Sequence, residues 1–317
     1  MRSWIGIALF LLLTLVIFTG TMQAQQTGTS AAGTSVKSPG ECSRACLFEI
    51  LTNYLEALVK HNPEGLPLAK SLRATENGTE VKLGEGIWKT ALNFSYRHSF
   101  VDASTGQAGF HGVVREGDQP AIMALRLRVE DRKIAEAETL IARQGAHPLF
   151  SPESLHAPKA PWAASVPEQQ RSPRAKMIAA AQSYFDGIEQ SNHGIVPLHP
   201  DRTRTENGVQ TTNNPPDFSS SCGGSIAGIT YVKSVRDHRF PIVDETNGLV
   251  WAIVHFDVPR DIESTPPRSD LQIQTQLKKS RTLLLYELFK IEDGKISEIE
   301  AFMSNAPLGA SVGWPSK

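Results

Sequence analysis

The chain has 317 residues, of which 40% are hydrophobic and 21% are charged, and its formal net charge is -1 at pH 7. A chain of this length and composition can bury two ordinary hydrophobic cores. Because Lys and Arg do not outnumber Asp and Glu, there is no positive excess to hold a phosphate backbone, and we expect no nucleic-acid partner.

Residues 1–24 have the pattern of a secretory signal peptide. One Arg precedes an apolar run from Trp4 to Phe18, and small residues follow as far as Ala24, where we place cleavage. A membrane anchor is the alternative, but the run is short for the ~20 residues that cross a bilayer. We therefore expect a secreted or periplasmic protein with no membrane span after signal removal. Residues 25–41 are rich in Gly, Ser and Thr and should form a disordered tether.

Three cysteines are present, which is an odd number for an exported chain. Cys42 and Cys46 are close enough to form a disulfide if the segment between them is not yet regular helix. We favour that pair and expect Cys222 to be a free thiol. A nucleophilic role for Cys222 would require a neighbouring base that the sequence does not identify.

Residues 144–174 form a proline-rich linker. Prolines recur from Pro148 to Pro173, so neither a helix nor an interior strand should run through this segment. Phe150 and Trp162 indicate that the linker packs against the protein surface.

The chain contains an internal repeat, which is clearest in the sequence Thr-Glu-Asn-Gly. This sequence ends at Gly78 in "LRATENG" and again at Gly208 in "RTRTENG". Around it, Tyr54 aligns with Tyr184, and further along Asp102 aligns with Asp244. In "LRVEDRKIAEAE" and "FKIEDGKISEIE", Glu136 and Glu138 align with Glu298 and Glu300. We therefore expect one duplicated domain, at residues 42–143 and 175–305, with a tail at 306–317.

Each repeat begins with the periodicity of an amphipathic helix and continues with strand-like alternation. The helical positions are Cys46, Ile50, Tyr54 and Leu58 in the first repeat, and Ile178, Tyr184 and Ile188 in the second. "AIMALRLRVE", "LVWAIVHFDV" and "RTLLLYELFKI" read as long, mostly buried strands, and "EDRK" and "EDGK" as hairpin turns. This order predicts an α+β fold with a helix packed against a curved sheet.

These residues carry a resemblance to known families. "YLEALVKHNPEGL" resembles the first-helix signature of the nuclear transport factor 2-like (SnoaL-like, cystatin-like) cone fold, which includes ketosteroid isomerase and scytalone dehydratase. Residues from Cys42 to Asn305, apart from the linker, are more closely similar to a domain-of-unknown-function family of secreted fungal and bacterial proteins. The resemblance implies two tandem cone domains, each a curved antiparallel sheet wrapped around its N-terminal helix. An exposed sheet face usually needs a partner, so we expect an intramolecular pseudo-dimer.

Ketosteroid isomerase supplies a template for candidate residues, because a helix Tyr and a protonated late-strand acid form its oxyanion hole. The helix Tyr corresponds to Tyr54 and Tyr184. The late-strand acid corresponds to Glu287 in the second repeat but to Leu125 in the first. The base falls at Asn77 and Asn207 or, with a one-residue gap, at Glu76 and Glu206.

Glu287 is the most informative candidate, since it shares a strand face with Leu285 and Phe289. Burial there would disfavour the carboxylate and make Glu287 an acid at neutral pH; an ion pair with an Arg is the alternative. Tyrosines such as Tyr54 and Tyr184 are more often core residues whose hydroxyl finds a backbone acceptor than catalytic groups. A capped turn explains Asn-Gly in the repeated motif, which leaves a pocket role open for Glu206.

His255 and Asp257 lie two residues apart, so both side chains project from one strand face, with Trp251. They could act as a base and its orienting partner; a metal site would need a third ligand that the sequence does not provide. We include Tyr231, Trp251, Tyr54 and Glu76 as ligand-binding candidates.

Six further charged positions are expected to form structural ion pairs or to lie on the surface. The recurrence of Arg97/Asp102 as Arg239/Asp244 predicts an ion pair within each repeat. Arg126 and Arg128 alternate away from the apolar face, and we expect them to face solvent; binding of an anionic ligand is the alternative.

The sequence has no nucleotide-binding glycine motif, no nucleophile elbow, and no zinc-binding His or Cys motif, so any catalysis should need no cofactor and no metal. The resulting prediction is a small-molecule pocket in the second domain with Glu287, Tyr184, Glu206, His255 and Asp257 as acid/base groups of a lyase or isomerase. The alternative is a non-catalytic ligand-binding or protein-interaction module.

Overall fold

A computed structural model of the chain describes residues 42–213, 226, 229, 231–259, 279–311 and 313–314. The chain divides into two units, residues 1–37 and 38–317, and all the described residues belong to the second unit. The predicted signal peptide, the tether and Cys222 lie outside the described residues.

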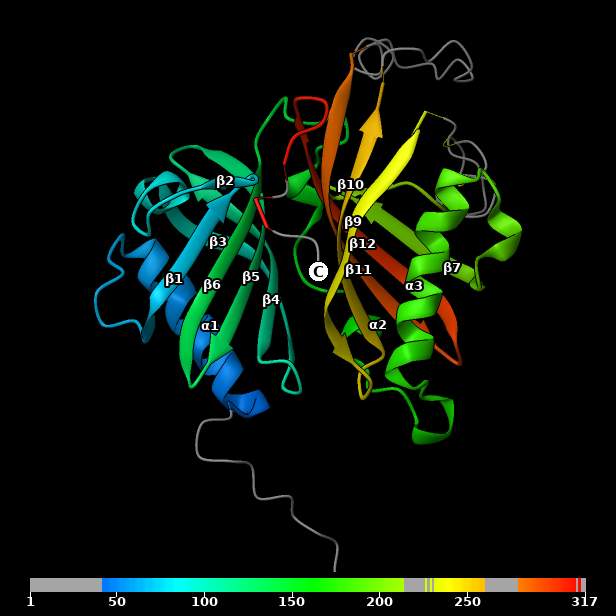
Figure 1. The fold of residues 1–317 in the computed structure, drawn as a ribbon, viewed down its shortest axis with the longest axis horizontal. Coiled ribbons are helices and arrows are strands. Elements are labelled where there is room, and N and C mark those ends of the chain that lie inside the picture. Colours follow the sequence, from blue (N-terminus) through cyan, green and yellow to red (C-terminus); the bar gives the residue numbers. More distant parts are fainter. Residues whose placement is uncertain are drawn as a thin grey trace, which may run out of the picture. The chain divides into compact units, whose positions relative to one another are not determined.

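The first repeat consists of one helix, a short 3-10 helix and six strands (Figure 1). They are α1 (Arg44–Val59), β1 (Leu68–Glu76), β2 (Thr79–Glu80), η1 (Gly86–Lys89), β3 (Ala91–Asp102), β4 (Gln107–Glu116), β5 (Gln119–Glu130) and β6 (Lys133–Ala142).

The second repeat follows the same order of elements. They are α3 (Arg174–Glu189), η4 (His193–Ile195), β7 (Leu198–Glu206), β8 (Val209–Gln210), β9 (Ser234–Asp244), β10 (Leu249–Val258), β11 (Arg281–Glu292) and β12 (Lys295–Ala306).

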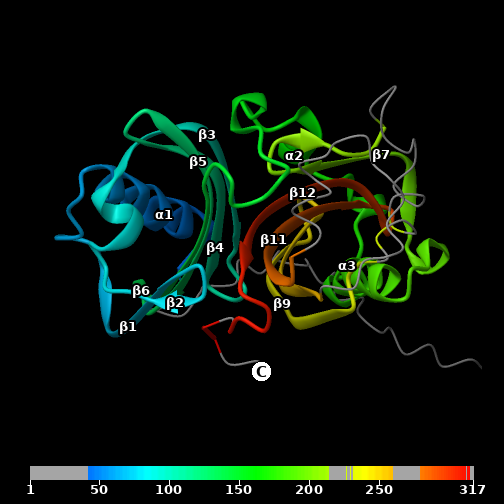
Figure 2. The same ribbon diagram turned by 90° about the horizontal axis from the view of Figure 1, so that it is seen from above.

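The two sheets have identical strand orders, β2-β1-β6-β5-β4-β3 and β8-β7-β12-β11-β10-β9. This confirms the α+β fold with two cone domains, but each sheet is mixed rather than purely antiparallel, because β1 runs parallel to β6 and β7 runs parallel to β12. The first long strand of each sheet lies between the short strand that follows it and the last strand of the repeat. Figure 2 shows α1 lying within the curve of the first sheet.

The helices form where the sequence periodicity predicts, and their apolar faces pack against the sheets. Ser43 caps α1 by accepting a hydrogen bond from the backbone N–H of Cys46. Leu47, Leu51 and Leu58 are at most 1% exposed. Burial of each such side chain contributes about 2 kcal/mol relative to exposure.

The repeated Thr-Glu-Asn-Gly has a structural explanation. Asn77 and Asn207 both adopt left-handed backbone conformations, with φ of 49° and 46°, which Asn tolerates better than most residues. The Asn77 side chain donates to Ile141 O and accepts from Ile141 N, and Asn207 does the same with Met303. Each Asn therefore ties the end of the first strand to the last strand of its sheet.

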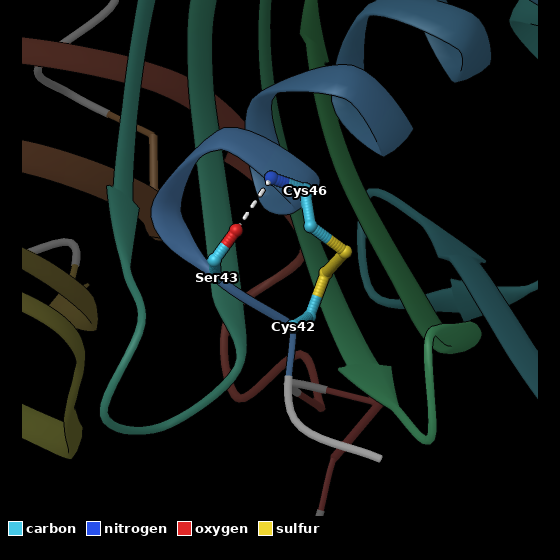
Figure 3. The surroundings of a disulfide bond; sticks show 3 residues. All are labelled: Cys42, Ser43 and Cys46. Carbon is cyan, nitrogen blue, oxygen red and sulfur yellow. Dashed lines mark hydrogen bonds between the residues drawn. A yellow bond between two sulfur atoms is a disulfide. The ribbon is translucent and has the colours of Figure 1, made fainter. Parts of the chain in front are cut away.

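Cys42 and Cys46 form a disulfide at the start of α1 (Figure 3). Their Cα atoms are 5.3 Å apart, within the usual range for a disulfide. The expected pairing of these two residues is present.

The linker contains short helical segments that the prolines alone did not predict. These are η2 (Pro152–Ser154), α2 (Ala160–Ala163) and η3 (Glu168–Gln170). Pro161 is tolerated in α2 because it lies in the first turn, where its missing N–H would have no partner in any case. Trp162 is only 4% exposed, so the linker does pack against the protein.

Each repeat has its own core on the helix side of its sheet, and a third cluster contains residues of both sheets. We call this third group the shared cluster; it includes Tyr96, Phe100, Ile122, Trp251, Tyr286 and Phe302. The opposite sheet faces are therefore buried against each other through these side chains.

The ion pairs expected within each repeat do not form. Asp102 pairs with Arg174 of the second repeat at 2.6 Å, and Asp244 pairs with Arg44 of the first repeat at 2.7 Å. Arg239 instead bonds Glu138 of the first repeat. Arg97, which is exposed, lies over the ring of Phe94. The predicted pairs were wrong because the partner of each acid comes from the other repeat.

Arg126 also differs from expectation, because it is 3% exposed rather than solvated. Its guanidinium donates to Glu138 and Glu136, each at 2.7 Å. Arg128 is partly buried and donates to Glu136 as well.

Candidate active site in the second repeat

Three elements of the second repeat bring polar side chains into an otherwise apolar core. Glu287 comes from β11, on the face that it shares with Leu285 and Phe289, which belong to the second core. Tyr184 comes from the middle of α3, and Arg204 from β7. All three are nearly fully buried, with exposed fractions of 2%, 2% and 3%.

These three side chains form a hydrogen-bonded chain. Arg204 Nη1 donates a hydrogen bond to the Tyr184 hydroxyl oxygen at 3.1 Å. The Tyr184 hydroxyl in turn donates a hydrogen bond to the Glu287 carboxyl group. Arg204 is held in turn by Thr211, which accepts from Nε at 3.0 Å. The arrangement fixes the Tyr184 hydroxyl between a cation and a carboxyl group.

Burial raises the pKa of Glu287 to about 8, against the opposing effect of the Arg204 charge. Glu287 is therefore protonated at neutral pH. Its Oε2 atom has no hydrogen-bond partner among the residues that the structure describes. A buried, protonated carboxyl group with an unpartnered oxygen can donate a hydrogen bond to a bound molecule.

Glu206 lies close to this group. Its Oε2 is 3.4 Å from Arg204 Nη2, and its negative charge contributes to the raised pKa of Glu287. The Glu206 side chain is 17% exposed, so it is closer to solvent than Glu287. The structure thus brings together three of the five predicted acid/base residues: Glu287, Tyr184 and Glu206.

The first repeat lacks this arrangement. Leu125 occupies the position of Glu287, and Ala74 occupies the position of Arg204; both lie in the apolar core. Tyr54 accepts a hydrogen bond from Trp88 Nε1 at 3.3 Å, and Glu76 accepts one from the backbone N–H of Ile87 at 2.8 Å. Tyr54 and Glu76 therefore have structural partners.

His255, Asp257 and Trp251 lie on the opposite face of the second sheet. Trp251 belongs to the shared cluster and donates from Nε1 to Nε2 of His111 at 2.9 Å. Asp257 accepts from Arg236 and Thr282. The sheet separates these three residues from Glu287, so they do not join it in one site.

His255 is 3% exposed, and burial lowers its pKa to about 4. It is therefore neutral at pH 7. Tyr231, the remaining ligand-binding candidate, is partly buried and packs against the second core.

Two buried glutamates, Glu138 and Glu300, lie on the sheet faces that carry the shared cluster and were not predicted as site residues. Glu300 accepts from the Tyr96 hydroxyl at 2.7 Å and from His111 Nδ1 at 2.9 Å. Because His111 Nε2 accepts from Trp251, its proton is on Nδ1. Burial alone would raise the pKa of Glu300, but the hydrogen bonds from His111 and His98 hold it well below its usual range.

Glu138, the counterpart of Glu300, has mainly cationic partners. It accepts from Arg126 at 2.7 Å, from Arg239 at 2.5 Å and from the Tyr286 hydroxyl at 3.1 Å. Burial alone would raise the pKa of Glu138, but the charges of Arg126 and Arg239 outweigh it and lower that pKa. The repeated Glu-x-Glu pattern was visible in the sequence, but not the origin of its partners.

No three His, Cys, Asp or Glu side chains are grouped to hold a metal ion within the described ranges. None of the helices formed by those residues is long and apolar enough to span a bilayer.

Comparison with known families matches residues 170–303, which include most of the second repeat, to a domain of unknown function, DUF8021. No curated protein matches the chain.

Solved structures of low sequence identity resemble part of the chain. One is a protein of unknown function with a cystatin-like fold from Methylobium petroleophilum PM1, with 15% identity, a TM-score of 0.29, and coverage of 35% of this chain and 85% of that one. Another is an epoxide hydrolase from M. tuberculosis, with 12% identity, a TM-score of 0.29, and coverage of 41% and 84%. A third is a de novo designed protein with a curved β-sheet, with 15% identity, a TM-score of 0.28, and coverage of 32% and 89%.

Proposed function

We propose that the second repeat binds a small molecule and that Glu287 acts on it as a general acid, in a cofactor-free lyase or isomerase reaction. The observation that carries the proposal is the buried, protonated Glu287, whose Oε2 has no partner among the described residues. Burying a polar atom without a hydrogen bond costs free energy of folding, and a bound molecule that hydrogen-bonds to this atom would offset that cost.

The hydrogen-bonded chain from Arg204 through Tyr184 to Glu287 suggests a role for each residue. A protonated Glu287 donates its proton, or a hydrogen bond, to an oxygen on which negative charge develops. Tyr184, polarised by Arg204, holds the carboxyl group in position. Glu206 is the candidate base, because it is a second carboxylate near the first in a more exposed environment. Two carboxyl groups whose surroundings differ in this way can divide acid and base roles.

Comparison of the two repeats supports this assignment over a purely structural role. The first repeat replaces Glu287 with Leu125 and Arg204 with Ala74 and still forms the same sheet. The fold therefore does not require the buried acid or the buried cation. The first repeat is assigned a structural role.

The overall organisation belongs to the same proposal. The domains extend over residues 42–143 and 175–305, and they form an intramolecular pseudo-dimer through the shared cluster and the reciprocal pairs Arg174–Asp102 and Arg44–Asp244. The protein is exported after removal of residues 1–24. The Cys42–Cys46 disulfide supports this localisation, since such bonds persist mainly in oxidising compartments.

A thermal-shift screen of small carbonyl and hydroxyl compounds tests the proposal. A ligand at ~100 times its Kd stabilises the protein by ~2.7 kcal/mol. We expect Glu287→Gln and Tyr184→Phe to change the stabilisation by a hit compound, and Glu287→Gln to lower its turnover at least ~100-fold. Tyr54→Phe is the matched control in the first repeat and should change neither. A hit that both second-repeat variants bind and convert like the unmodified protein contradicts the proposal.

A further inference from the structure

A pocket with a volume of about 400 Å³ lies where the linker covers the β7–β8 hairpin. Its lining includes Leu155, Lys159 and Trp162 from the linker, Thr205 and Glu300 from the second sheet, and Tyr96 from the first sheet. The volume falls within the range of small-molecule sites. Neither Glu287 nor Tyr184 lines the pocket, so it is separate from the candidate acid site.

In the first repeat, the place that corresponds to this pocket is filled by Trp314 of the C-terminal tail. Trp314 is 8% exposed, and its Nε1 donates a hydrogen bond to Thr75 Oγ1 at 3.0 Å. Thr75 is the counterpart of Thr205 in the repeated Thr-Glu-Asn-Gly. Each threonine lies opposite a buried glutamate in its sheet: Thr75 pairs with Glu138, and Thr205 pairs with Glu300.

The C-terminal tail and the linker each approach the glycine that ends the Thr-Glu-Asn-Gly motif: the tail approaches Gly78 and the linker approaches Gly208. A Cβ added to Gly313 of the tail would lie 2.5 Å from Gly78 O, and a Cβ added to Gly208 would lie 2.0 Å from Ser151 O of the linker. Only glycine permits such close backbone contacts. The tail therefore covers the first motif as the linker covers the second. The indole of Trp314 hydrogen-bonds to Thr75, whereas the linker's own indole, Trp162, lies in the pocket wall with its ring centroid 5.4 Å from that of His98.

A positively charged side chain lies beside Trp314 in the first repeat and beside the pocket in the second. The Arg73 guanidinium carbon lies 4.3 Å from the centroid of the Trp314 ring, a cation–π contact. The counterpart of Arg73 is Thr203, which cannot supply a charge. Lys159 of the linker supplies it instead, because its Nζ donates to Thr203 Oγ1 at 3.0 Å and the residue lines the pocket.

We propose that this pocket is a second ligand site, which binds a small planar aromatic molecule carrying an N–H or O–H donor. The ring occupies the place that Trp314 fills in the first repeat. Thr205 accepts the hydrogen bond from the ligand, and Lys159 contacts the ring face. The second repeat retains the acceptor Thr205 and the motif glycine Gly208, and Lys159 of the linker replaces the cation Arg73. The space that an indole would fill beside Thr205 is open.

Calorimetric titration of the purified protein with indole and with N-acetyl-L-tryptophanamide tests this site. We expect saturable binding of at least one of these probes, with one molecule per chain. Thr205→Val should weaken binding about tenfold, the effect of losing one hydrogen bond. Thr75→Val, the matched change at the filled position, should leave the affinity unchanged. Glu287→Gln should also leave it unchanged, which distinguishes this site from the proposed acid site.

Two further variants test the relationship between the two positions. Trp314→Ala should open the first position and raise the stoichiometry from one to two. Ala157→Phe, at an exposed linker residue that lines the pocket, should block binding without disturbing a core. The proposal is overturned if neither probe binds saturably up to ~10 mM, or if Thr205→Val and Ala157→Phe bind the probe as well as the unmodified protein does. Binding that is lost in Glu287→Gln would also overturn it, since the probe would then occupy the core of the second repeat.

Discussion

Arg174 at the start of α3 lies 2.6 Å from Asp102 at the end of β3, and the equivalent residues Arg44 and Asp244 lie 2.7 Å apart in the reciprocal arrangement. Each repeat thus supplies the cation to one pair and the acid to the other. Reciprocity of this kind characterises an interface with two-fold symmetry. These reciprocal contacts support the proposed intramolecular pseudo-dimer.

Replacement of Asp102 tests this relationship. The Asp102 side chain is 3% exposed and accepts hydrogen bonds from Arg174, Ser104 and the backbone of Val243. We expect Asp102→Asn to lower the free energy of unfolding by about 1–3 kcal/mol, measured by urea denaturation. Arg97→Ala should change it by less than ~0.5 kcal/mol, because Arg97 is exposed. Equal losses in the two variants would instead favour an Arg97–Asp102 pair.

The two buried glutamates of the shared face should respond differently to the loss of charge. Glu138→Gln leaves the partly buried Arg239 without the carboxylate that it hydrogen-bonds and leaves Arg126 with the Glu136 carboxylate alone, and we expect a loss of about 3–5 kcal/mol. Glu300→Gln should cost less, because His111 can still donate to the amide oxygen and the Tyr96 hydroxyl can accept from the amide NH2 group. Chemical denaturation of both variants gives the comparison, and a larger loss for Glu300→Gln would contradict it.

The raised pKa of Glu287 predicts a specific dependence of stability on pH. The folded carboxyl group titrates at about 8 and the unfolded one near 4.5, so between these pH values only the folded state keeps the proton. Stability should therefore fall by about 1.4 kcal/mol per pH unit across this window as pH rises. Glu287→Gln should remove this contribution.

His255 and His147 give stability the opposite dependence on pH from Glu287 below pH 6.5, since burial lowers the pKa of each to about 4. Their contribution to stability is lost as pH falls, because the unfolded state takes up protons first. Both histidines remain in Glu287→Gln, so the difference between the two proteins isolates Glu287. Identical pH profiles from pH 5 to pH 8 would count against a raised Glu287 pKa.

The turn at Asn207 should be sensitive to both side chain and backbone. Asn207→Ala removes hydrogen bonds to Met303 and Leu149 and places a methyl group at a φ of 46°, so we expect a loss of about 2–4 kcal/mol. Asn207→Gly should cost roughly 1 kcal/mol less, because glycine tolerates this conformation. Thermal unfolding of the two variants measures the difference. If alanine were tolerated as well as glycine, backbone conformation would not explain the repeated Asn.

The sequence identified much of the fold and part of the site. The burial of Glu287 could be predicted, because alternation along β11 places it on the same face as the apolar residues Leu285 and Phe289. The face of His255 was not, because both faces of β10 are apolar and alternation does not reveal which one points toward the helix. The partners of Asp102 and Glu138 could not be predicted either, since they depend on contacts between the repeats.

The proposed function requires the carboxyl group of Glu287 to remain protonated at neutral pH. The most direct measurement is a titration of glutamate side-chain carboxyl carbons by 13C NMR, in the unmodified protein and in Glu287→Gln. We predict one resonance with an apparent pKa of about 8 that is absent from the variant. A Glu287 resonance that titrates near 4.5 would contradict the account and leave Glu287 as an ordinary ionised residue.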